Sequence, residues 1–407
     1  MKVLHIIPSL SPGLGGPTQV ALYLVHVLRT LGIDAEIATT NHDTHGPLPV
    51  ATHKRVEYVF DTDRQLSVPV WFLPYSSPTL KEFIFSKAIT GWLWRNTKQY
   101  DLLDNHYLFS YTPTCAAAIA RWHGIPYTIR TMGQLTPWAL AQSTTKKKLY
   151  ASLIENRNLK RAAAIHCTSN EEAENVREFG INTPTVTLPL GVAVPPPIPD
   201  APAKLRHAYG LKSETPIILF LSRLHYKKQP EILLKAIQRL TEKQAAHSPP
   251  CHVILAGTGE PDYLKTLQDL AQTLGIDHQV TFTGFVTGYD KHLLLQGSTA
   301  FALPSHSENF GIAVAEALIS GLPVIITPGI QISSEIHNAK AGLMVKADEE
   351  AFAIALHQLI TQPALQNELR RNGLQFAQTQ YSWTAIGQQL ATVYQTIVTQ
   401  HQKRATV

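Results

Sequence analysis

Two glutamates are the residues of this sequence whose spacing points most directly to chemistry. Glu308 and Glu316 lie eight positions apart in a stretch, residues 304–327, that carries no other Asp, Glu, Lys or Arg. Glu316 has apolar neighbours on both sides, so an ionised carboxylate there needs hydrogen-bond donors, and sugar hydroxyls are donors of the right kind. The spacing alone fits equally well a helix-capping acid at Glu308 and a solvated helix position at Glu316.

The two glutamates are expected around the start of a helix that follows a buried strand. Residues 299–303 predict the strand, residues 305–307 predict a polar turn, and Phe310–Ile319 predicts an apolar helix that ends at Gly321. Free backbone N–H groups at the start of that helix, around Asn309–Gly311, suit an anion such as a phosphate.

In the order of its motifs the chain resembles the retaining glycosyltransferases of family 4, which have the GT-B fold. The two glutamates look like the E-x7-E signature of that family. The likeness runs from a glycine-rich loop near the N-terminus through Arg223 and Lys228 to Tyr381-Ser382-Trp383, and so covers nearly the whole chain. Each motif is weak alone, but their order and spacing are specific. The resemblance implies that Glu308 contacts the hydroxyls of a donor sugar and Glu316 contacts a ribose.

Length and composition agree with a two-domain cytoplasmic protein. The 407 residues suit two domains, each large enough to bury its own core. Cys115, Cys167 and Cys251 are widely spaced in apolar contexts, which fits neither a metal pattern nor a disulfide framework. The N-terminal residues predict a buried strand and not a signal peptide, and no apolar run is long enough to span a bilayer. The net charge of +5 comes without a basic tract, so no nucleic-acid partner is expected.

A proline-rich segment, residues 192–202, divides the sequence almost in half, because its prolines disfavour helix and strand and stiffen a linker. On both sides strand-like runs alternate with helical patterns, which predicts an α/β fold of two Rossmann-like, doubly wound parallel sheets with ligands at the C-terminal strand ends. The resemblance implies that an acceptor-binding domain, 1–195, and a nucleotide-sugar-binding domain, 203–383, face a central cleft. It also implies that a C-terminal helix, 384–407, crosses back to the first domain.

The predicted strands are Lys2–Ile7, Asp34–Thr39, Val56–Phe60, Asp101–Asn105, Tyr127–Arg130, Ala164–Thr168 and Thr185–Leu188 before the linker, and Pro216–Leu221, His252–Ala256, Gln279–Thr283, Thr299–Leu303, Pro323–Ile326 and Gly342–Val345 after it.

The glycine-rich loop SPGLGGPT, residues 11–18, follows the first predicted strand and precedes a predicted helix. Its glycines do not form the G-x-G-x-x-G pattern, and the acidic residue expected near the end of the second strand is only partly supplied, so a dinucleotide-dependent oxidoreductase is disfavoured. The resemblance implies that Gly15 and Gly16 let the backbone approach the donor diphosphate or the acceptor. A plain strand-to-helix turn is the alternative for both glycines.

Two cations follow the first strand of the second half, just before a helix expected to start near Pro230. They are Arg223 and Lys228, in LSRLHYKKQPE. By resemblance to an R-L-x3-K-G pattern, they neutralise the donor pyrophosphate and so stabilise the charge on the leaving nucleoside diphosphate. Gln229 stands where the pattern has glycine, and Lys227 is an alternative to Lys228 for this role.

Two further loops of the second half, after the strands that end near residues 256 and 283, are expected to line a nucleotide pocket. Glycines in such loops often only turn the chain. The resemblance implies that Gly257 and Val286 lie at the base, with contact mainly through the backbone, so the side chains do not reveal which base is bound.

In the first half, His106 follows the predicted strand Asp101–Asn105, in a loop that would face the cleft. The resemblance implies that a histidine near this place contacts the transferred sugar. RTMGQLTPW, residues 130–138, looks like the R-x-x-G-x-L-x-x-W segment of transferases that build exopolysaccharides or lipid-linked oligosaccharides, so Arg130 or Trp138 is expected to help to hold an acceptor. Trp138 would stack on a sugar face, with a buried anchor as the alternative. The histidines of this half that are expected to be structural are His5, His123 and His166.

No required metal or other cofactor is expected. Asp61-Thr62-Asp63 spells D-x-D, the metal-binding signature of the other large transferase fold, but its context here differs from that fold. Enzymes with the GT-B fold usually stabilise the diphosphate with cationic side chains and helix N-termini. Peripheral contact with the inner face of the plasma membrane is a further expectation, drawn from Lys146–Lys148, Trp92 and Trp94, because a basic and aromatic surface docks onto anionic lipid. A solvated helix face is the alternative.

Taken together, the motifs predict a cytoplasmic retaining glycosyltransferase. It would move a hexose from a nucleotide-diphosphate sugar to a hydroxyl of a saccharide or a lipid-linked saccharide, and form an α-glycosidic bond. The implied mechanism is front-face substitution, in which the leaving diphosphate helps to accept the proton. Two alternatives stay open: a nucleotide-sugar epimerase of the same fold, which needs no acceptor, and a nucleotide-sugar-binding protein without catalysis.

Overall fold

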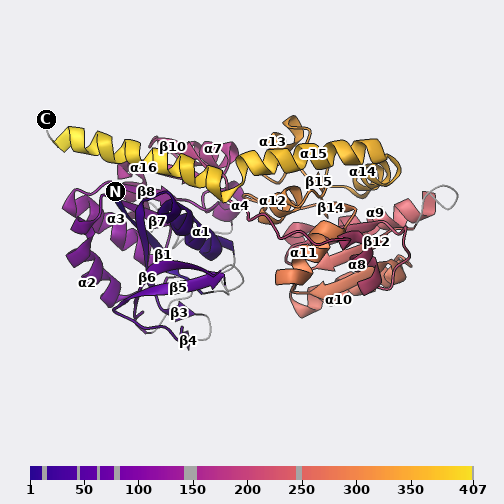
Figure 1. Cartoon of the computed structure of the whole chain (residues 1–407), viewed down its shortest axis with the longest axis horizontal. Coiled ribbons are helices and arrows are strands. Elements are labelled where there is room, and N and C mark those ends of the chain that lie inside the picture. Colours follow the sequence, from indigo (N-terminus) through magenta and orange to yellow (C-terminus); the bar gives the residue numbers. More distant parts are fainter. Residues whose placement is uncertain are drawn as a thin grey trace. The chain divides into compact units, whose positions relative to one another are not determined.

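The computed structural model shows a chain that forms two compact units (Figure 1). The first unit holds Met1–Gly191 together with Trp383–Val407, and the second holds Val192–Ser382. The structure describes residues 1–11, 16–43, 46–61, 65–77, 83–141, 154–243 and 250–405. The first unit is therefore built from both ends of the chain, and the proline-rich segment belongs to the second.

The first unit is built on an eight-stranded sheet in the order β10-β9-β8-β7-β1-β2-β6-β5. All neighbouring strands pair in parallel except β5 and β6, which are antiparallel. The expectation of a wholly parallel sheet was wrong at this edge. The bounds of the strands are Lys2–Ser9 (β1), Asp34–Thr40 (β2), Arg55–Asp61 (β5), Leu66–Leu73 (β6), Leu102–His106 (β7), Tyr127–Arg130 (β8), Ala164–Cys167 (β9) and Thr185–Thr187 (β10). A separate hairpin joins His42–Asp43 (β3) to Gly46–Pro47 (β4).

Strand β6 is absent from the sequence prediction, and it contains Pro69, a residue type that is rare inside strands. In the structure Pro69 pairs with Glu57 of β5, whereas pairing with β2 begins only at Val70. Proline has no backbone N–H to donate, and at Pro69 strand β6 is not paired with β2.

The two faces of this sheet differ in chemistry, because successive side chains of a strand point to opposite faces. One face presents apolar side chains that pack against helix α3, Tyr111–His123, in a buried cluster. They include Leu4, Ile6, Leu103, Ile129 and Ile165. The other face carries the polar residues between them and is covered by helix α16, Trp383–Ala405, whose Tyr394 contacts His5 and His166.

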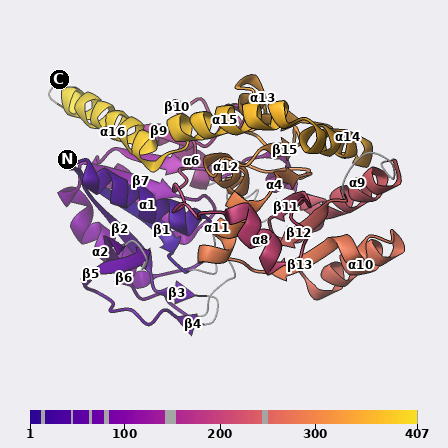
Figure 2. The same ribbon diagram turned by 45° about the vertical axis from the view of Figure 1, so that its right-hand side comes forward.

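The C-terminal helix α16 packs along α1, Gly16–Thr30 (Figures 1 and 2). The rings of Tyr23 and Trp383 stack with their centroids 5.0 Å apart. A Cβ atom at Gly387 would lie 2.7 Å from the Val27 side chain, so the two helices approach closely at that glycine. The C-terminal helix therefore belongs to the first unit, as expected.

The remaining helices of the first unit are Lys87–Asn96 (α2), Thr97–Gln99 (η2), Pro137–Ala141 (α4), Asn156–Arg161 (α6) and Asn170–Glu178 (α7). Helix α2 follows Ser86, which caps it and accepts a hydrogen bond from the N–H of Ile89 at 3.1 Å.

The second unit has a six-stranded, wholly parallel sheet in the order β13-β12-β11-β14-β15-β16. The strand order reverses between β11 and β14, and ligands of such sheets bind beside the C-terminal strand ends at this point. The bounds are Ile217–Leu221 (β11), His252–Ala256 (β12), Val280–Gly284 (β13), Ala300–Leu303 (β14), Val324–Ile326 (β15) and Gly342–Met344 (β16). All six strands match the predicted runs to within a few residues.

The helices of the second unit are Ala201–Ala208 (α8), Tyr226–Lys228 (η4), Pro230–Lys243 (α9), Pro261–Thr273 (α10), Asp277–Gln279 (η5), Gly288–Gly297 (α11), Ile312–Ile319 (α12), Ser333–Asn338 (α13), Glu349–Thr361 (α14) and Pro363–Gln380 (α15). Helix α12 begins two residues later than predicted, because its N-cap Gly311 has a left-handed backbone with φ of 81°. Among the described residues of both units, no helix is long and apolar enough to cross a bilayer.

Candidate functional site

A pocket of about 260 Å³ opens at the C-terminal ends of β11 and β12 in the second unit. The predicted residues Arg223, Gly257, Val286 and Glu316 all line it. They come from the loops after β11, β12 and β13 and from helix α12. The structure therefore brings together four candidates that are almost 100 positions apart in the sequence.

The loops around this pocket approach each other through backbone alone. Gly257 has φ of 148°, and a Cβ atom there would lie 1.9 Å from the carbonyl oxygen of Ser222. The N–H of Gly257 donates to the carbonyl of Gly284 at 2.8 Å. Because any side chain at Gly257 would collide with the neighbouring loop, this glycine is required to form the wall of the pocket.

Lys291, on helix α11, pairs with Glu316 inside the pocket. Its Nζ lies 2.6 Å from Oε1 of Glu316, and both side chains are about one quarter exposed. The apolar residues beside Glu316 in the sequence point elsewhere around the helix, so the glutamate itself faces the pocket. Sequence reasoning missed Lys291, which looks like an ordinary surface lysine. Its position in the sequence could have pointed to the pocket, because Lys291 lies near the start of the helix that follows the predicted pocket loop.

Lys228 and Glu308 form a second, more deeply buried ion pair, between Nζ and Oε1. Burial, followed by the positive charges of Lys227 and Arg223, lowers the pKa of Lys228 to about 7, and the carboxylate of Glu308 acts in the opposite direction. Of the two neighbouring lysines, it is therefore Lys228 whose ammonium meets the first glutamate of the signature.

The backbone around Glu308 fixes its position and rules out a capping role. Its N–H donates to the carbonyl of Gly329 at 2.8 Å, and its carbonyl accepts from the N–H of Gln331 at 3.1 Å. The N-cap of α12 is Gly311, without a side-chain capping bond. Gln229, at the position of the pattern's glycine, has a left-handed backbone with φ of 50°, which glycine adopts more easily.

The side chains of the remaining candidate residues of the second unit differ in their exposure to solvent. Arg223 is exposed at the pocket, and Asn309 is half-buried. The ring of Phe310 is buried and packs edge-on against Tyr381, with the centroids 5.3 Å apart. A ligand would therefore meet Phe310 only through its backbone.

In the first unit, His106 lies in a different place from the one expected. It is the last residue of β7, pairs in register with Arg130 of β8, and is completely buried. The prediction ended this strand at Asn105 and placed His106 in an open loop. That placement was wrong, because β7 stays paired with β8 through His106 and α16 covers this face.

Arg130 is buried too, as the last residue of β8. Its Nε donates to Oδ2 of Asp104 at 2.7 Å, so its charge neutralises a buried carboxylate. Gly16 is the first residue of α1, and Trp138 belongs to the short helix α4. Gly15 and the side chain of Trp138 lie outside the described residues.

The tryptophans behind the membrane expectation separate in the structure. Trp92 is buried against Trp71, whereas Trp94 is half exposed and its ring lies 5.9 Å from that of Trp122, which is 76% exposed. Lys146–Lys148 lie outside the described residues, as do Thr62 and Asp63 of the D-x-D tripeptide.

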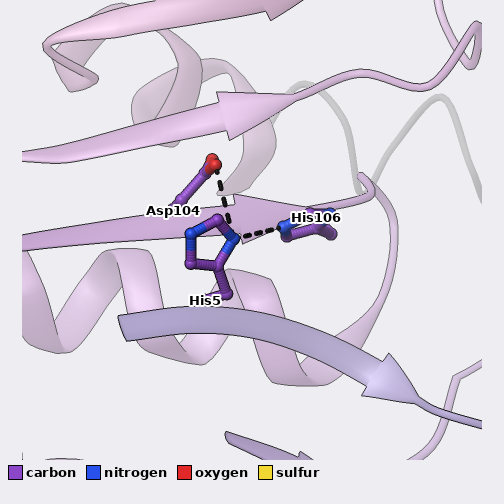
Figure 3. A group of neighbouring side chains, drawn as sticks. All are labelled: His5, Asp104 and His106. Atoms are coloured by element: carbon purple, nitrogen blue, oxygen red, sulfur yellow. Dashed lines mark hydrogen bonds and ion pairs between the residues drawn. The ribbon is translucent and has the colours of Figure 1, made fainter. Parts of the chain in front are cut away.

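His5, Asp104 and His106 form a buried group whose ligand atoms lie within 4.8 Å of one another, close enough to hold a metal ion (Figure 3). Nδ1 of His5 lies 3.0 Å from Nε2 of His106 and 3.7 Å from Oδ2 of Asp104. The same Oδ2 already accepts bonds from Arg130 and Tyr394. A metal cation there would face a guanidinium charge and would break these bonds, so the residues fit a hydrogen-bond network better than a metal site.

Two family models match the chain, one on each side of the linker. The model "Glycosyl transferase 4-like domain" matches residues 15–191, and "Glycosyl transferases group 1" matches residues 203–376. A D-inositol 3-phosphate glycosyltransferase of Xylanimonas cellulosilytica is 26% identical over 97% of this chain and 95% of its own length. The enzyme of that name from Thermobifida fusca is also 26% identical, over 99% of this chain and 94% of its own.

Solved structures share the fold over the full length. The crystal structure of Anabaena HepE in complex with UDP has a TM-score of 0.76 at 18% identity, and covers 97% of this chain and 100% of its own. Sucrose-phosphate synthase of Thermosynechococcus elongatus has a TM-score of 0.73 at 19% identity, over 98% and 99%. At this level of identity these structures establish the fold alone.

Proposed function

Because the chain belongs to the group 1 glycosyltransferases and has the GT-B fold, we propose that it is a retaining enzyme that transfers a hexose from a nucleotide-diphosphate sugar and forms an α-glycosidic bond. The observation that carries this proposal is the pair of glutamates at one strand-end site, each beside a lysine. Carboxylates bind sugar hydroxyls, whereas the neighbouring cations bind phosphate.

The donor is proposed to bind across this site from the pocket to Glu308. The nucleoside would occupy the pocket at Gly257 and Val286, with its ribose at Glu316. The diphosphate would lie at Arg223 and Lys228, and the sugar hydroxyls would meet Glu308. The titles of the HepE structures name UDP and UDP-glucose, which makes a uridine nucleotide the first donor to test here.

The proposed chemistry is a front-face substitution at the anomeric carbon. The bond from that carbon to the diphosphate oxygen breaks, and the bond to the acceptor oxygen forms on the same face, while the acceptor proton passes to the leaving diphosphate. Arg223 and Lys228 would stabilise the negative charge that develops on the diphosphate. Because these cations supply the positive charge, we propose that the transfer needs no metal cofactor.

The acceptor is proposed to be a saccharide or a lipid-linked saccharide, in polysaccharide synthesis at the cytoplasmic face of the plasma membrane. The resemblance of residues 130–138 to transferases of that kind supports this, with Trp138 in the segment; Arg130 is occupied by Asp104. The exposed rings of Trp94 and Trp122 support peripheral contact with the membrane, because tryptophan favours the lipid–water interface.

Calorimetric binding of UDP, GDP, ADP and their glucose derivatives, with a chelator present, tests the donor site. We expect one nucleotide family to bind, and Arg223→Ala to weaken its binding about tenfold or more, since a charge-assisted contact to phosphate is lost. The matched control is Arg239→Ala, which removes a cation of the same unit that pairs with Glu349. Binding by none of the nucleotides, or equal binding by Arg223→Ala, would contradict the proposal.

Transfer is then measured with the donor that binds and a panel of saccharide acceptors, with the product anomer assigned by NMR. An α-linked product from an α-linked donor supports retention, whereas a β-linked product contradicts it. Isomerisation of the nucleotide sugar without acceptor would show an epimerase, and tight binding without turnover would show a binding protein.

A further inference from the structure

The pocket of the second unit combines a hydrogen-bond acceptor and a hydrogen-bond donor in direct contact. Among the described residues that line it, Glu316 holds the one carboxylate, and Nζ of Lys291 lies 2.6 Å from Oε1 of that carboxylate. All of the lining residues belong to the second unit. What the pair can bind therefore follows from the geometry of this unit alone.

The backbone of two helices fixes where these side chains lie. Helix α11 starts at Gly288 after its N-cap Thr287, which itself lines the pocket. The N–H of Lys291 donates to the carbonyl of Thr287 at 3.4 Å, so Lys291 lies one helical turn beyond the pocket loop. On α12 it is Glu316 that lines the pocket, whereas its neighbours Ala315 and Ala317 are buried in the core.

The pair leaves most of its hydrogen-bonding capacity unused. An ammonium has three N–H donors and no acceptor, whereas a carboxylate has two oxygens that only accept. Among the described residues, the one hydrogen-bond partner of the Lys291 ammonium is Glu316, and the one partner of that carboxylate is Lys291. Both side chains are about one quarter exposed, so the remaining donors and acceptors can meet a ligand in the pocket.

A hydroxyl group is the ligand group that satisfies both members of the pair. Its hydrogen can be donated to the carboxylate while a lone pair of its oxygen accepts from the ammonium. A hydroxyl that reaches Glu316 also comes within reach of Lys291, because Nζ touches the same carboxylate. A phosphate oxygen or a carbonyl oxygen of a base only accepts, so the negative charge of Glu316 disfavours it at this place.

We propose that Lys291 determines specificity for a ribonucleotide: its ammonium donates to the oxygen of one ribose hydroxyl, while Glu316 accepts from both adjacent hydroxyls. The identity of the ligand rests on the proposed function, which places the ribose at Glu316, whereas the ion pair is a property of the chain itself. Lys291 is thereby assigned to the nucleoside and not to the diphosphate, whose proposed partners are Arg223 and Lys228. Without a ligand the same ammonium neutralises the charge of Glu316.

The test measures affinity by calorimetry for UDP, 2′-deoxy-UDP and 3′-deoxy-UDP. If GDP or ADP is the nucleotide that binds, it and its two deoxy forms take the place of the uridine set. The full chain is compared as wild type, Lys291→Met, which removes the donor, and Lys291→Gln, which keeps a neutral donor. Glu316→Gln and Arg223→Ala are the comparisons within the same pocket. Circular dichroism checks folding, because all six tryptophans lie in the first unit.

Wild type is expected to bind UDP about tenfold more tightly than either deoxy form, since each lost hydroxyl leaves a charged group without its partner. Lys291→Met should bind UDP about fivefold less tightly than wild type does. It should bind one of the two deoxy forms as well as wild type does, because that form lacks the hydroxyl that the ammonium contacts. Lys291→Gln should recover part of the loss. Glu316→Gln should weaken the preference over both deoxy forms, and Arg223→Ala should weaken all three ligands by the same factor.

Equal weakening of UDP and both deoxy forms in Lys291→Met would overturn the proposal, because it would assign the lysine to the diphosphate. An equal loss of preference at both hydroxyls would overturn it too, since Lys291 would then only hold Glu316 in place. Unchanged or tighter binding of UDP would show that the lysine does not contact the ribose, or competes with it for Glu316. Binding of no nucleotide would overturn the proposed function as well, whereas the expected affinities without transfer to any acceptor would overturn the proposed function alone.

Discussion

The two polar sites of this chain use charge in opposite ways. In the second unit, Lys291 and Glu316 form an ion pair whose side chains are each about one quarter exposed, on helices that border a pocket. In the first unit, Arg130 and Asp104 form a pair with almost no exposure, on neighbouring strands of a sheet. Water solvates the first pair and lets a ligand exchange with it, whereas the second pair has only its fixed protein partners.

This difference in exposure suits the two pairs to different tasks. Partly exposed charges such as Lys291 and Glu316 are open to phosphate and hydroxyl groups, because solvent and ligands can reach them. A buried network holds protons in fixed positions, because desolvation suppresses titration and the hydrogen bonds that Asp104 accepts come from fixed protein donors. Binding of the donor is therefore expected to depend on the second unit, whereas the buried network of Asp104 is expected to govern the stability of the first.

Removal of Asp104 should give the largest effect, because it leaves the Arg130 guanidinium buried without a counter-charge. We expect Asp104→Ala to lower the free energy of unfolding of the first unit by about 3–5 kcal/mol. Urea unfolding followed by tryptophan fluorescence measures this unit alone. Glu316→Ala is the matched control in the second unit and should leave that transition unchanged. A loss below about 1 kcal/mol would show that Arg130 does not depend on Asp104.

Should Asp104→Ala fail to fold, Asp104→Asn keeps the shape and removes only the charge. Its unfolding transition should lie between those of wild type and of the alanine variant. A transition equal to that of wild type would show that the charge of Asp104 contributes nothing to stability.

The buried histidines should make the stability of the first unit fall as the pH falls. Burial, with the opposing charge of Asp104 outweighed, lowers the pKa of His5 to about 4, and burial with the charge of Arg130 lowers that of His166 to about 3. The unfolded chain takes up protons at these rings below about pH 6.5, whereas the folded chain does not. Stability is therefore lost from about pH 6.5 to pH 5, by up to about 1.4 kcal/mol per pH unit for each histidine.

Urea unfolding by tryptophan fluorescence at several values between about pH 7 and pH 5 measures this slope. His5→Asn is the control, since it removes one of the protons that the unfolded chain takes up, and it should reduce the slope accordingly. A stability that is flat over this range would mean that the buried rings already carry protons in the folded chain.

The sequence predicts the second unit better than the first, and the reason is physical. The strands of a parallel sheet are buried on both faces, so they are visible as apolar runs, and all six were found. The pocket residues stand in loops directly after those strands, where Arg223, Gly257 and Val286 were expected. Lys291 could not be recognised, because only the packing of α11 against α12 shows that it faces Glu316.

In the first unit, the local sequence pattern does not reveal which polar side chains are buried. His106 looks like a loop residue, yet it is buried, because a helix from the far end of the chain covers it. Tyr394 bonds to Asp104 across 290 positions of sequence, and no local pattern reports such a contact. Arg130 similarly looks like an exposed binding residue until the structure shows its bond to Asp104.

A pH effect of opposite sign is expected for donor binding in the second unit. Burial and the nearby charges of Lys227 and Arg223 lower the pKa of Lys228 to about 7, so its charge is lost as the pH rises above that value. In the proposed function that charge binds the diphosphate, so the affinity for a nucleoside diphosphate should fall by up to about tenfold per pH unit above pH 7. Calorimetric titration measures this. Lys228→Arg, which stays protonated, should remove the dependence, and a wild-type affinity that is constant above pH 7 would contradict it.

The smallest effect is expected from the partly exposed pair of Lys291 and Glu316, and it sharpens the comparison most. In a double-mutant cycle of Lys291→Met and Glu316→Gln, the coupling free energy should be about 0.2–1 kcal/mol, because water solvates both groups. Hydrogen exchange of α11 and α12 measures it, since the second unit has no tryptophan. Added salt should weaken this coupling but leave the stability of the Asp104 network almost unchanged, because ions screen exposed charges and not buried ones. If salt weakened both ion pairs equally, the difference in burial would not explain how the two sites use charge, and the sites would differ only in the residues they contain.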